Sequence, residues 1–200
     1  NAFDLQDHTL KVDKELVFLS VGRMDAWRGF DILIDAFIEY HKLSNSKLIL
    51  LGDGTEYKFL VEKINRNNAS AYIQMPGNVS MEEYNQYMKN CDIVVNSCLK
   101  EGAVTNAFDC MRWGKPLICI DTGGYTRNFS SKSAYIIPRF NNRKEIQDGL
   151  LDAMKAMSEY ETRKQYSEEI IKLGEKFEWE KKGEEIRALF DKKIDEWKVK

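Results

Sequence analysis

The 200-residue sequence lacks the features that mark several large protein classes. Its four cysteines form no C-x-x-C pair, and with only two histidines they offer few ligands for a structural zinc ion. Three prolines and twelve glycines leave no low-complexity linker. The longest early apolar run covers residues 16–21, which is far too short to cross a bilayer. We therefore expect neither a structural zinc site nor a transmembrane segment.

The charge balance disfavours nucleic acid as a partner. The chain carries 30 basic and 32 acidic side chains and a formal net charge of −2, whereas a protein that binds through phosphate contacts is usually basic. With 43% apolar and 12% aromatic residues, the composition is that of a globular protein. Because no secretory signal precedes the cysteines, we expect reduced thiols and a cytoplasmic protein.

Two glycine motifs of nucleotide-binding enzymes are also absent. The G-D-G at 52–54 is followed by Tyr57 where a dinucleotide fingerprint has its third glycine. The G-K at 114–115 precedes Pro116, so the Ser or Thr of a P-loop is missing. These absences disfavour a Walker-type NTPase and a nicotinamide-dependent enzyme such as a sugar-nucleotide epimerase.

Short apolar runs alternate with longer amphipathic segments through most of the chain. The runs predict strands at residues 16–21, 48–51, 72–75, 92–96, 116–120 and 135–137. The amphipathic spacing predicts helices at residues 31–43, 57–64, 81–89, 104–113, 146–157, 163–176 and 180–197. Strands that are apolar on both faces belong in parallel sheets covered by helices. We therefore expect an α/β fold with a Rossmann-like, doubly wound parallel sheet of about six strands and extra C-terminal helices.

The same pattern divides the chain into three parts. Residues 1–15 are polar and irregular and predict an entry segment or linker. Residues 16–175 hold the alternating pattern and form the expected Rossmann-like domain. Residues 176–200 form a charged helical segment.

In open parallel sheets, ligands bind beyond the carboxyl ends of the strands. After the first strand, Arg23 and Arg28 lie five residues apart in a loop that opens a helix. Guanidinium groups suit phosphate oxygens, and the start of a helix adds backbone N–H donors. An equally good interpretation is a pair of surface arginines that bridge acids such as Asp25 or Asp31.

Two carboxylates flank the helix expected to begin near residue 104. Glu101 lies in the loop before it, and the helical period directs Asp109 back toward the strand end. An anion could sit at the helix start between two acids that each accept hydrogen bonds from a polyol. A sugar joined to a nucleoside by a diphosphate has that layout. Taken alone, the segment favours a simpler interpretation, in which Glu101 caps the helix and Asp109 is solvated.

Together these segments resemble the C-terminal half of a family 4 glycosyltransferase with the GT-B fold. The resemblance covers nearly the whole chain and includes the pair Glu101 and Asp109, separated by seven residues. The other matching segments are N-A-F-D at 1–4, F-L-S-V-G-R at 18–23, R-G at 28–29, L-L-G-D-G at 50–54, G-K-P-L-I at 114–118, G-G at 123–124 and F-E-W-E at 177–180.

The resemblance implies a role for each residue. Arg23 and Arg28 would hold the donor diphosphate and stabilise the leaving nucleotide, Glu101 would contact the transferred sugar, and Asp109 would accept the ribose hydroxyls. The remaining donor-binding residues would be Gly22, Met75, Gly77, Val104, Thr105 and Asn106. The implied reaction is transfer from a UDP-, GDP- or ADP-linked sugar with retention at the anomeric carbon, without a metal or other cofactor.

Three positions depart from the family pattern. Arg28 replaces a lysine, Asp109 is shorter than the usual glutamate by about 1.5 Å, and Ala103-Val104 replaces Phe-Gly. These departures keep an alternative open, namely a non-catalytic module of the same fold that binds a nucleotide-sugar or a protein.

The resemblance also implies a missing half. In this family the acceptor site lies on an N-terminal domain across a cleft, so we expect a fragment of a longer polypeptide or a chain that needs a partner. The last helix, residues 184–197, would cross back toward that domain, and any peripheral membrane contact would be made by the missing half. The acceptor would belong to glycan or glycolipid biosynthesis.

Overall fold

The computed structural model describes residues 10, 15–100, 105–139, 141–177 and 179–198. Its six strands form one parallel sheet in the order β3-β2-β1-β4-β5-β6, which confirms the predicted α/β, doubly wound fold. The strands are β1 (Leu16–Val21), β2 (Ser46–Leu51), β3 (Ile73–Gly77), β4 (Ile93–Asn96), β5 (Leu117–Ile120) and β6 (Tyr135–Ile137). The order reverses between β1 and β4, and the edge beyond these two strands is where such sheets bind ligands.

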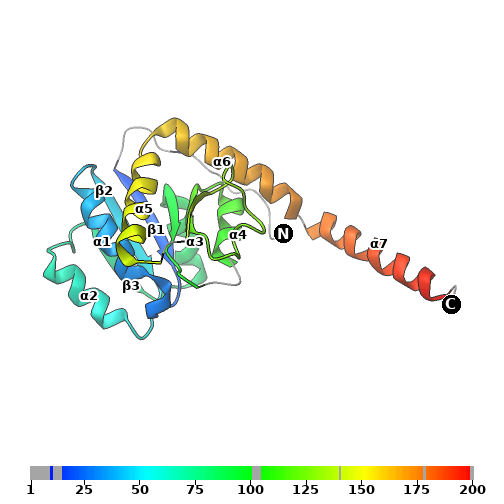
Figure 1. Ribbon diagram of the computed structural model, residues 1–200, viewed down its shortest axis with the longest axis horizontal. Helices are drawn as coiled ribbons and strands as arrows, with labels where there is room; N and C mark the ends of the chain where they lie inside the picture. The colour runs from blue at the N-terminus through cyan, green and yellow to red at the C-terminus, as the bar shows by residue number, and fades with distance from the viewer. Residues whose placement is uncertain (1–9, 11–14, 101–104, 140, 178, 199–200) are drawn as a thin grey trace.

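Helices cover both faces of the sheet (Figure 1). They are α1 (Phe30–His41), α2 (Tyr57–Arg66), α3 (Met81–Asn90), α4 (Thr105–Trp113), α5 (Arg143–Ala156), α6 (Tyr160–Gly174) and α7 (Trp179–Lys198), with short 3-10 turns η1 (Ala26–Arg28) and η2 (Glu175–Phe177). The buried side chains of α1, α2 and α5 share one core cluster, and those of α3, α4 and α6 share the other.

Alternation along the strands produces these two clusters. Phe18 belongs to the first cluster and its neighbour Leu19 to the second, because successive side chains of a strand point to opposite faces. Both are fully buried. The strands are therefore apolar throughout, as a sheet covered on both faces requires.

Most element boundaries differ from the sequence prediction by one to three residues, and two of these differences have a clear cause. Strand β2 begins at Ser46 rather than residue 48, because the buried Ser46 pairs with Leu16 and so extends the ladder. Helix α6 begins at Tyr160 rather than residue 163. Residues 160–162 carry no apolar repeat, but the Arg163 N–H donates to the Glu159 carbonyl at 3.1 Å and closes the first turn.

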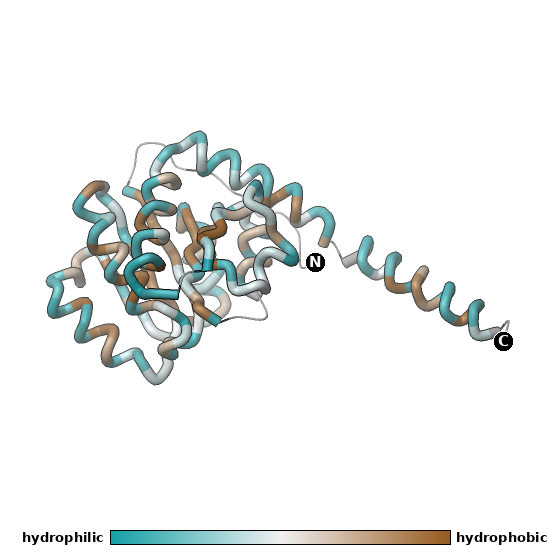
Figure 2. The backbone as a smooth tube through the Cα atoms, viewed as in Figure 1, coloured by the Kyte–Doolittle hydropathy of each residue, from teal (hydrophilic) through white to brown (hydrophobic). Residues whose placement is uncertain are grey.

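Helix α7 extends away from the domain, as Figures 1 and 2 show. It is amphipathic, and its apolar stripe is exposed to solvent. The stripe consists of Ile186, Leu189, Phe190, Ile194 and Trp197, which are 48–81% exposed. The predicted boundary at residue 176 falls within η2 and stays a prediction.

Candidate functional site

The loops that follow β1, β2 and β3 are joined by backbone hydrogen bonds. The Gly22 N–H donates to the Leu51 carbonyl at 3.0 Å, and the Gly52 N–H donates to the Gly77 carbonyl at 2.9 Å. Gly52 has φ +125°, and a Cβ atom there would lie 2.0 Å from the Gly22 carbonyl oxygen. Only glycine fits this approach, so the G-D-G segment serves to pack two loops together.

The loop after β1 also places Arg28 at the end of that strand. Its guanidinium lies 3.7 Å from where a Cβ on Gly22 would stand, and its Cζ lies 4.4 Å from the centre of the Trp27 ring. The Ser97 Oγ donates to the Arg28 carbonyl at 2.9 Å, which ties the loop to the end of β4. Arg28 is half-buried and positioned from several sides.

Arg23 has a different environment. Its side chain is 74% exposed, and its Nε lies 3.2 Å from the Asp25 carboxylate. Asp25 also accepts a hydrogen bond from the Thr55 Oγ1 at 3.1 Å. The structure therefore fixes Arg28 against the sheet and leaves Arg23 reaching into solvent.

Asn106, in the first turn of α4, joins three elements. Its amide nitrogen donates to the Val21 carbonyl at 3.2 Å, and its amide oxygen accepts from the Asn96 side chain at 3.2 Å. Asn96 in turn accepts from the Cys98 N–H at 3.0 Å. Asn106 lines the cavity described next, and its amide group also holds α4 to the ends of β1 and β4.

A cavity of about 350 Å³ lies beyond the ends of β1 and β2. We name it the strand-end cavity. Its lining residues come from two strand ends, from the start of α3 and from α4, and they are Val21, Leu51, Gly52, Asn78, Val79, Ser80, Met81, Tyr84, Asn106 and Asp109. Asp109 is the one acid among the described lining residues, so a carboxylate faces a space of ligand size beyond the ends of β1 and β2.

Tyr84 holds that carboxylate in place. Its hydroxyl donates to Asp109 Oδ2 at 2.7 Å. Burial raises the pKa of Asp109, while the bond from Tyr84 and the charge of Arg112 act in the opposite direction. Burial and the Asp109 charge together raise the pKa of Tyr84, which therefore stays protonated and remains a donor. No signal in the sequence points to Tyr84, because no local motif links it to Asp109, which is 25 positions away.

Helix α3, which carries Tyr84, is anchored at both ends. Ser80 and Glu83 form a reciprocal capping box at its start. At its other end, the buried Lys115 donates to the carbonyls of Lys89 at 2.9 Å and Cys91 at 2.8 Å. The G-K-P segment thus has a structural role in which a cation satisfies the carbonyls at a helix C-terminus.

Gly77 lies at a neighbouring cavity of about 450 Å³, and Met75 contacts one of its lining residues, Tyr57. Gly77 lines it together with Tyr57 and the turn at 53–55. The Tyr57 hydroxyl donates to the Met75 carbonyl at 3.0 Å, which fixes this border of the site.

The predicted donor-binding residues thus fall into three groups. Asn106 and Asp109 line the strand-end cavity with Val21, Arg28 rests against the adjoining Gly22, and Met75 and Gly77 border the neighbouring cavity. Thr105 is the first residue of α4. Glu101 and Val104 lie outside the described residues.

The described residues show neither a metal-binding cluster nor a membrane-spanning helix. They contain no cluster of His, Cys, Asp and Glu side chains that could hold a metal ion. None of the helices they form combines the length and apolar character needed to span a membrane.

Residues 3–173 match the sequence profile of the family described as "Glycosyl transferases group 1". This chain belongs to that family. An uncharacterized glycosyltransferase of Methanocaldococcus jannaschii is 29% identical in an alignment of 192 residues. The alignment covers 92% of this group 1 chain and 52% of that protein. The chain thus spans about half the length of this relative.

Solved structures show the same fold. The pneumococcal O-GlcNAc transferase GtfA, in complex with UDP and GlcNAc, matches with a TM-score of 0.76 and 20% identity over 95% of this group 1 chain and 38% of that chain. The C-terminal domain of a glycosyl transferase group 1 family protein (LpcC) from Francisella tularensis matches with a TM-score of 0.68 and 20% identity, over 79% and 83% of the two chains. These matches confirm the Rossmann-like half of a GT-B fold.

Proposed function

We propose that this chain is the donor-binding half of a retaining glycosyltransferase of family 4, which transfers a sugar from a nucleoside diphosphate to a glycan or glycolipid acceptor. Family membership and the crystallised complex of a structural relative with UDP and GlcNAc support this proposal. So does the match to a C-terminal domain that was crystallised by itself.

The main support comes from two side chains near the end of β1, an acid that lines the strand-end cavity and a guanidinium that packs on the adjoining glycine. Asp109 shares a cavity with Val21, and Arg28 lies against the next residue, Gly22. A carboxylate accepts hydrogen bonds from ribose hydroxyls, and a guanidinium donates to phosphate oxygens. In a nucleoside diphosphate the ribose hydroxyls lie close to the phosphate oxygens, so one ligand can engage both side chains.

The proposed reaction needs little covalent chemistry from the protein. The bond between the anomeric carbon and the diphosphate oxygen breaks, a bond to an acceptor hydroxyl forms on the same face of the sugar, and the hydroxyl proton leaves with the diphosphate. Negative charge grows on the diphosphate, where Arg28 and the more exposed Arg23 stabilise it. In this proposal Glu101 contacts the transferred sugar, and no metal takes part.

A thermal-shift panel with UDP, GDP, ADP and dTDP tests the assignment. A nucleotide at 100 times its Kd adds about 2.7 kcal/mol to the free energy of unfolding. For a chain of this size that raises Tm by roughly 5–11 °C. We expect one nucleotide to give this shift and Asp109→Asn to reduce it. No shift with any of the four nucleotides would refute donor binding by this chain.

Catalysis is a separate question from binding. The departures at Arg28, Asp109 and residues 103–104 leave room for a module that binds a nucleotide-sugar without transferring it. Release of nucleotide by the longer polypeptide, measured with and without acceptor, distinguishes the two functions, because a binding module shows the thermal shift and no release.

We further propose that α7 packs on the remainder of a longer polypeptide, which would hold the acceptor site. The chain covers 52% of a relative, and the stripe of α7 is exposed, with Trp197 at 81% and Phe190 at 63%. Hydrogen exchange tests this by comparing α7 in the 200-residue chain and in the longer polypeptide. We expect its amides to be protected in the latter, and equal exchange in both would contradict the proposal.

We also propose a cytoplasmic protein, as the sequence suggests. All four cysteines are buried free thiols, which suits a reducing compartment. Burial raises the pKa of Cys110 and Cys119, so these thiols stay protonated and unreactive. Fractionation of cells that produce the protein, with immunodetection in each fraction, tests the location.

A further inference from the structure

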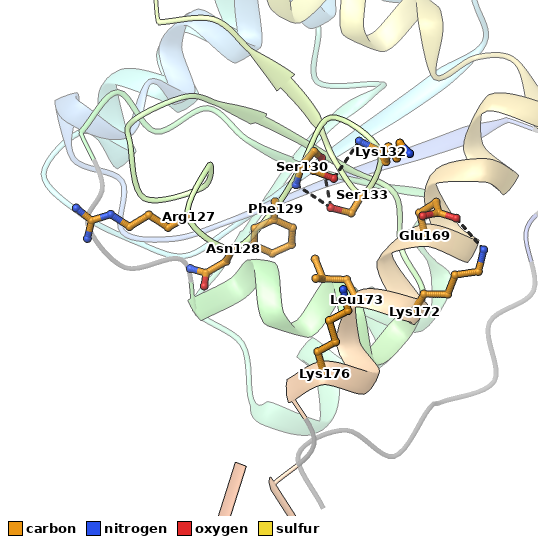
Figure 3. A pocket seen from close by; sticks show the side chains of 10 residues that line it. All are labelled: Arg127, Asn128, Phe129, Ser130, Lys132, Ser133, Glu169, Lys172, Leu173 and Lys176. Carbon is orange, nitrogen blue, oxygen red and sulfur yellow. Dashed lines mark hydrogen bonds and ion pairs between the residues drawn. The ribbon is translucent and has the colours of Figure 1, made fainter. Parts of the chain in front are cut away.

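A third cavity, of about 520 Å³, lies between the segment 127–133 and the C-terminal part of α6 (Figure 3). It shares no lining residue with the two cavities at the strand ends. We name it the basic cavity, because four of its lining side chains are the cations Arg127, Lys132, Lys172 and Lys176. Its volume lies in the range of small-molecule sites, about 300–1,000 Å³.

The balance of charge in this cavity is strongly positive, although the whole chain has a net charge of −2. Among the described residues, Glu169 is the one carboxylate in the lining, and its Oε1 lies 2.7 Å from the Lys172 Nζ. Hydrogen bonding from Lys172 lowers the pKa of Glu169, and the charge of Lys132 adds to the effect. The charges of Glu168 and Glu175, which lie outside the lining, help to raise the pKa of Lys172.

Three of the four cations are not committed to a protein partner. Among the described residues, the side chains of Arg127, Lys132 and Lys176 make no ion pair. Lysines elsewhere on the surface commonly have one, as in Lys42 with Glu39 or Lys144 with Asp148. Three like charges around one hollow repel one another, and an anionic ligand would remove that cost.

Hydrogen bonds within residues 130–133 order the loop that presents Lys132. Ser133 Oγ accepts from the Ser130 N–H at 3.1 Å, and Ser130 Oγ accepts from the Lys132 N–H at 3.3 Å. Figure 3 shows Phe129 and Leu173 facing the hollow between the charged side chains. The Phe129 ring is buried against Phe108 of α4, at 6.3 Å between ring centres. The cavity therefore combines a rigid apolar base with a cationic rim.

We propose that the basic cavity is a second ligand site, distinct from the donor site, that takes a phosphate monoester on a glycerol or sugar group. The dianionic phosphate binds at the rim through the ammonium groups of Lys132 and Lys176, and Arg127, whose guanidinium points away from the hollow in Figure 3, adds positive charge to the lining. The base at Phe129 and Leu173 offers a surface for the carbon face of the attached group. Such a phosphate can come from a soluble ester or from a phospholipid headgroup such as that of phosphatidic acid.

The test compares a charge-neutralised cavity with a matched control. The cavity variant carries Lys132→Gln and Lys176→Gln, and the control carries Lys89→Gln and Lys164→Gln, two exposed lysines outside the lining. Both are made in an Arg28→Ala background, so that phosphate binding at the proposed donor site does not contribute. Isothermal titration calorimetry uses glycerol 3-phosphate, with glycerol as the uncharged probe. Co-sedimentation uses vesicles of phosphatidylcholine with and without phosphatidic acid.

We expect the cavity variant to lose about tenfold or more in affinity for the phosphate ester, and the control to lose less than about twofold. Calorimetric binding of glycerol 3-phosphate would identify a soluble ester as the source. Sedimentation with phosphatidic acid alone, lost in the cavity variant, would identify the headgroup. Equal loss in both variants, or no phosphate-dependent binding in either assay, would overturn the proposal. A UDP thermal shift on the same substitutions with Arg28 intact should be unchanged, so this result is independent of the donor assignment.

Discussion

The strand-end cavity and the basic cavity differ in the way their polar groups are held. In the strand-end cavity the polar groups of Tyr84, Asp109 and Asn106 are joined by hydrogen bonds inside the protein. In the basic cavity the charges stand on long side chains, and only Lys172 has an ion-pair partner among the described residues. The first is therefore suited to recognise shape and hydrogen-bond pattern, and the second to recognise charge. Binding in the second should weaken steeply with salt.

Gly52→Ala should produce the largest difference in ligand affinity between the two cavities. The added Cβ would lie 2.0 Å from the Gly22 carbonyl oxygen at a φ of +125°. We expect a loss of about 2–5 kcal/mol in the free energy of unfolding and loss of nucleotide binding. Calorimetric affinity for glycerol 3-phosphate, measured below the lowered Tm, should be unchanged.

Gly183→Ala is the matched control for this substitution. Gly183 lies inside helix α7, and no atom lies within 4 Å of the Cβ that this substitution adds. Alanine should leave the free energy of unfolding unchanged or raise it by up to about 1 kcal/mol. If both variants gave the same Tm, the loop contact at Gly52 would not matter for the strand-end cavity.

The next largest effect should be the difference in nucleotide affinity between Arg28→Ala and Arg23→Ala. Because Arg28 is held against Gly22 and Trp27, its loss should weaken nucleotide binding by about 1.5–3 kcal/mol, or roughly 10–100-fold. Arg23 is 74% exposed, so Arg23→Ala should cost less. Calorimetric titration of each variant with the nucleotide that stabilises the wild-type chain measures the difference. Equal losses would place both guanidiniums on the diphosphate with the same strength.

A pH series should show a smaller effect at Asp109. Burial raises its pKa, so nucleotide affinity should fall as pH decreases through that raised value and the carboxylate gains a proton. In Tyr84→Phe the hydrogen bond that opposes this rise is gone, and the fall should begin at a higher pH. Asp109→Asn should bind more weakly with no such pH dependence. A flat wild-type profile would exclude Asp109 from the binding site.

The same pKa shift predicts the sign of a stability change. A carboxyl whose pKa is higher in the folded state takes up protons on folding, so stability falls as pH rises from the unfolded value to the folded one. At neutral pH the ionised Asp109 therefore costs stability. Asp109→Asn should raise Tm while it weakens nucleotide binding, which is a trade often found at functional sites. Differential scanning calorimetry of the wild-type chain and Asp109→Asn at two pH values measures this difference in Tm.

Local periodicity was sufficient to predict the sheet, and the strand ends indicated the edge where the strand-end cavity lies. The strands are apolar on both faces and the glycine turns follow them directly, so fold and edge could be read from neighbouring residues. Tyr84 could not be predicted in the same way, because its partner Asp109 is 25 positions away and meets it only when α3 and α4 pack on one face. The basic cavity depends on residues 127–133 and α6 coming together, which no local pattern encodes.

The smallest effect should come from removing α7. Among the described lining residues of the two cavities none belongs to this helix, and most of its described side chains are exposed. One contact with the domain is that of Lys182 with the Phe177 ring, at 5.9 Å, which is worth about 0.5–1 kcal/mol at an exposed site. A chain that ends at Phe177 should therefore keep its Tm within about 2–4 °C and both ligand affinities unchanged. A larger fall in Tm would mean that α7 supports the domain directly, and its apolar stripe would then need another explanation than docking on the rest of the polypeptide.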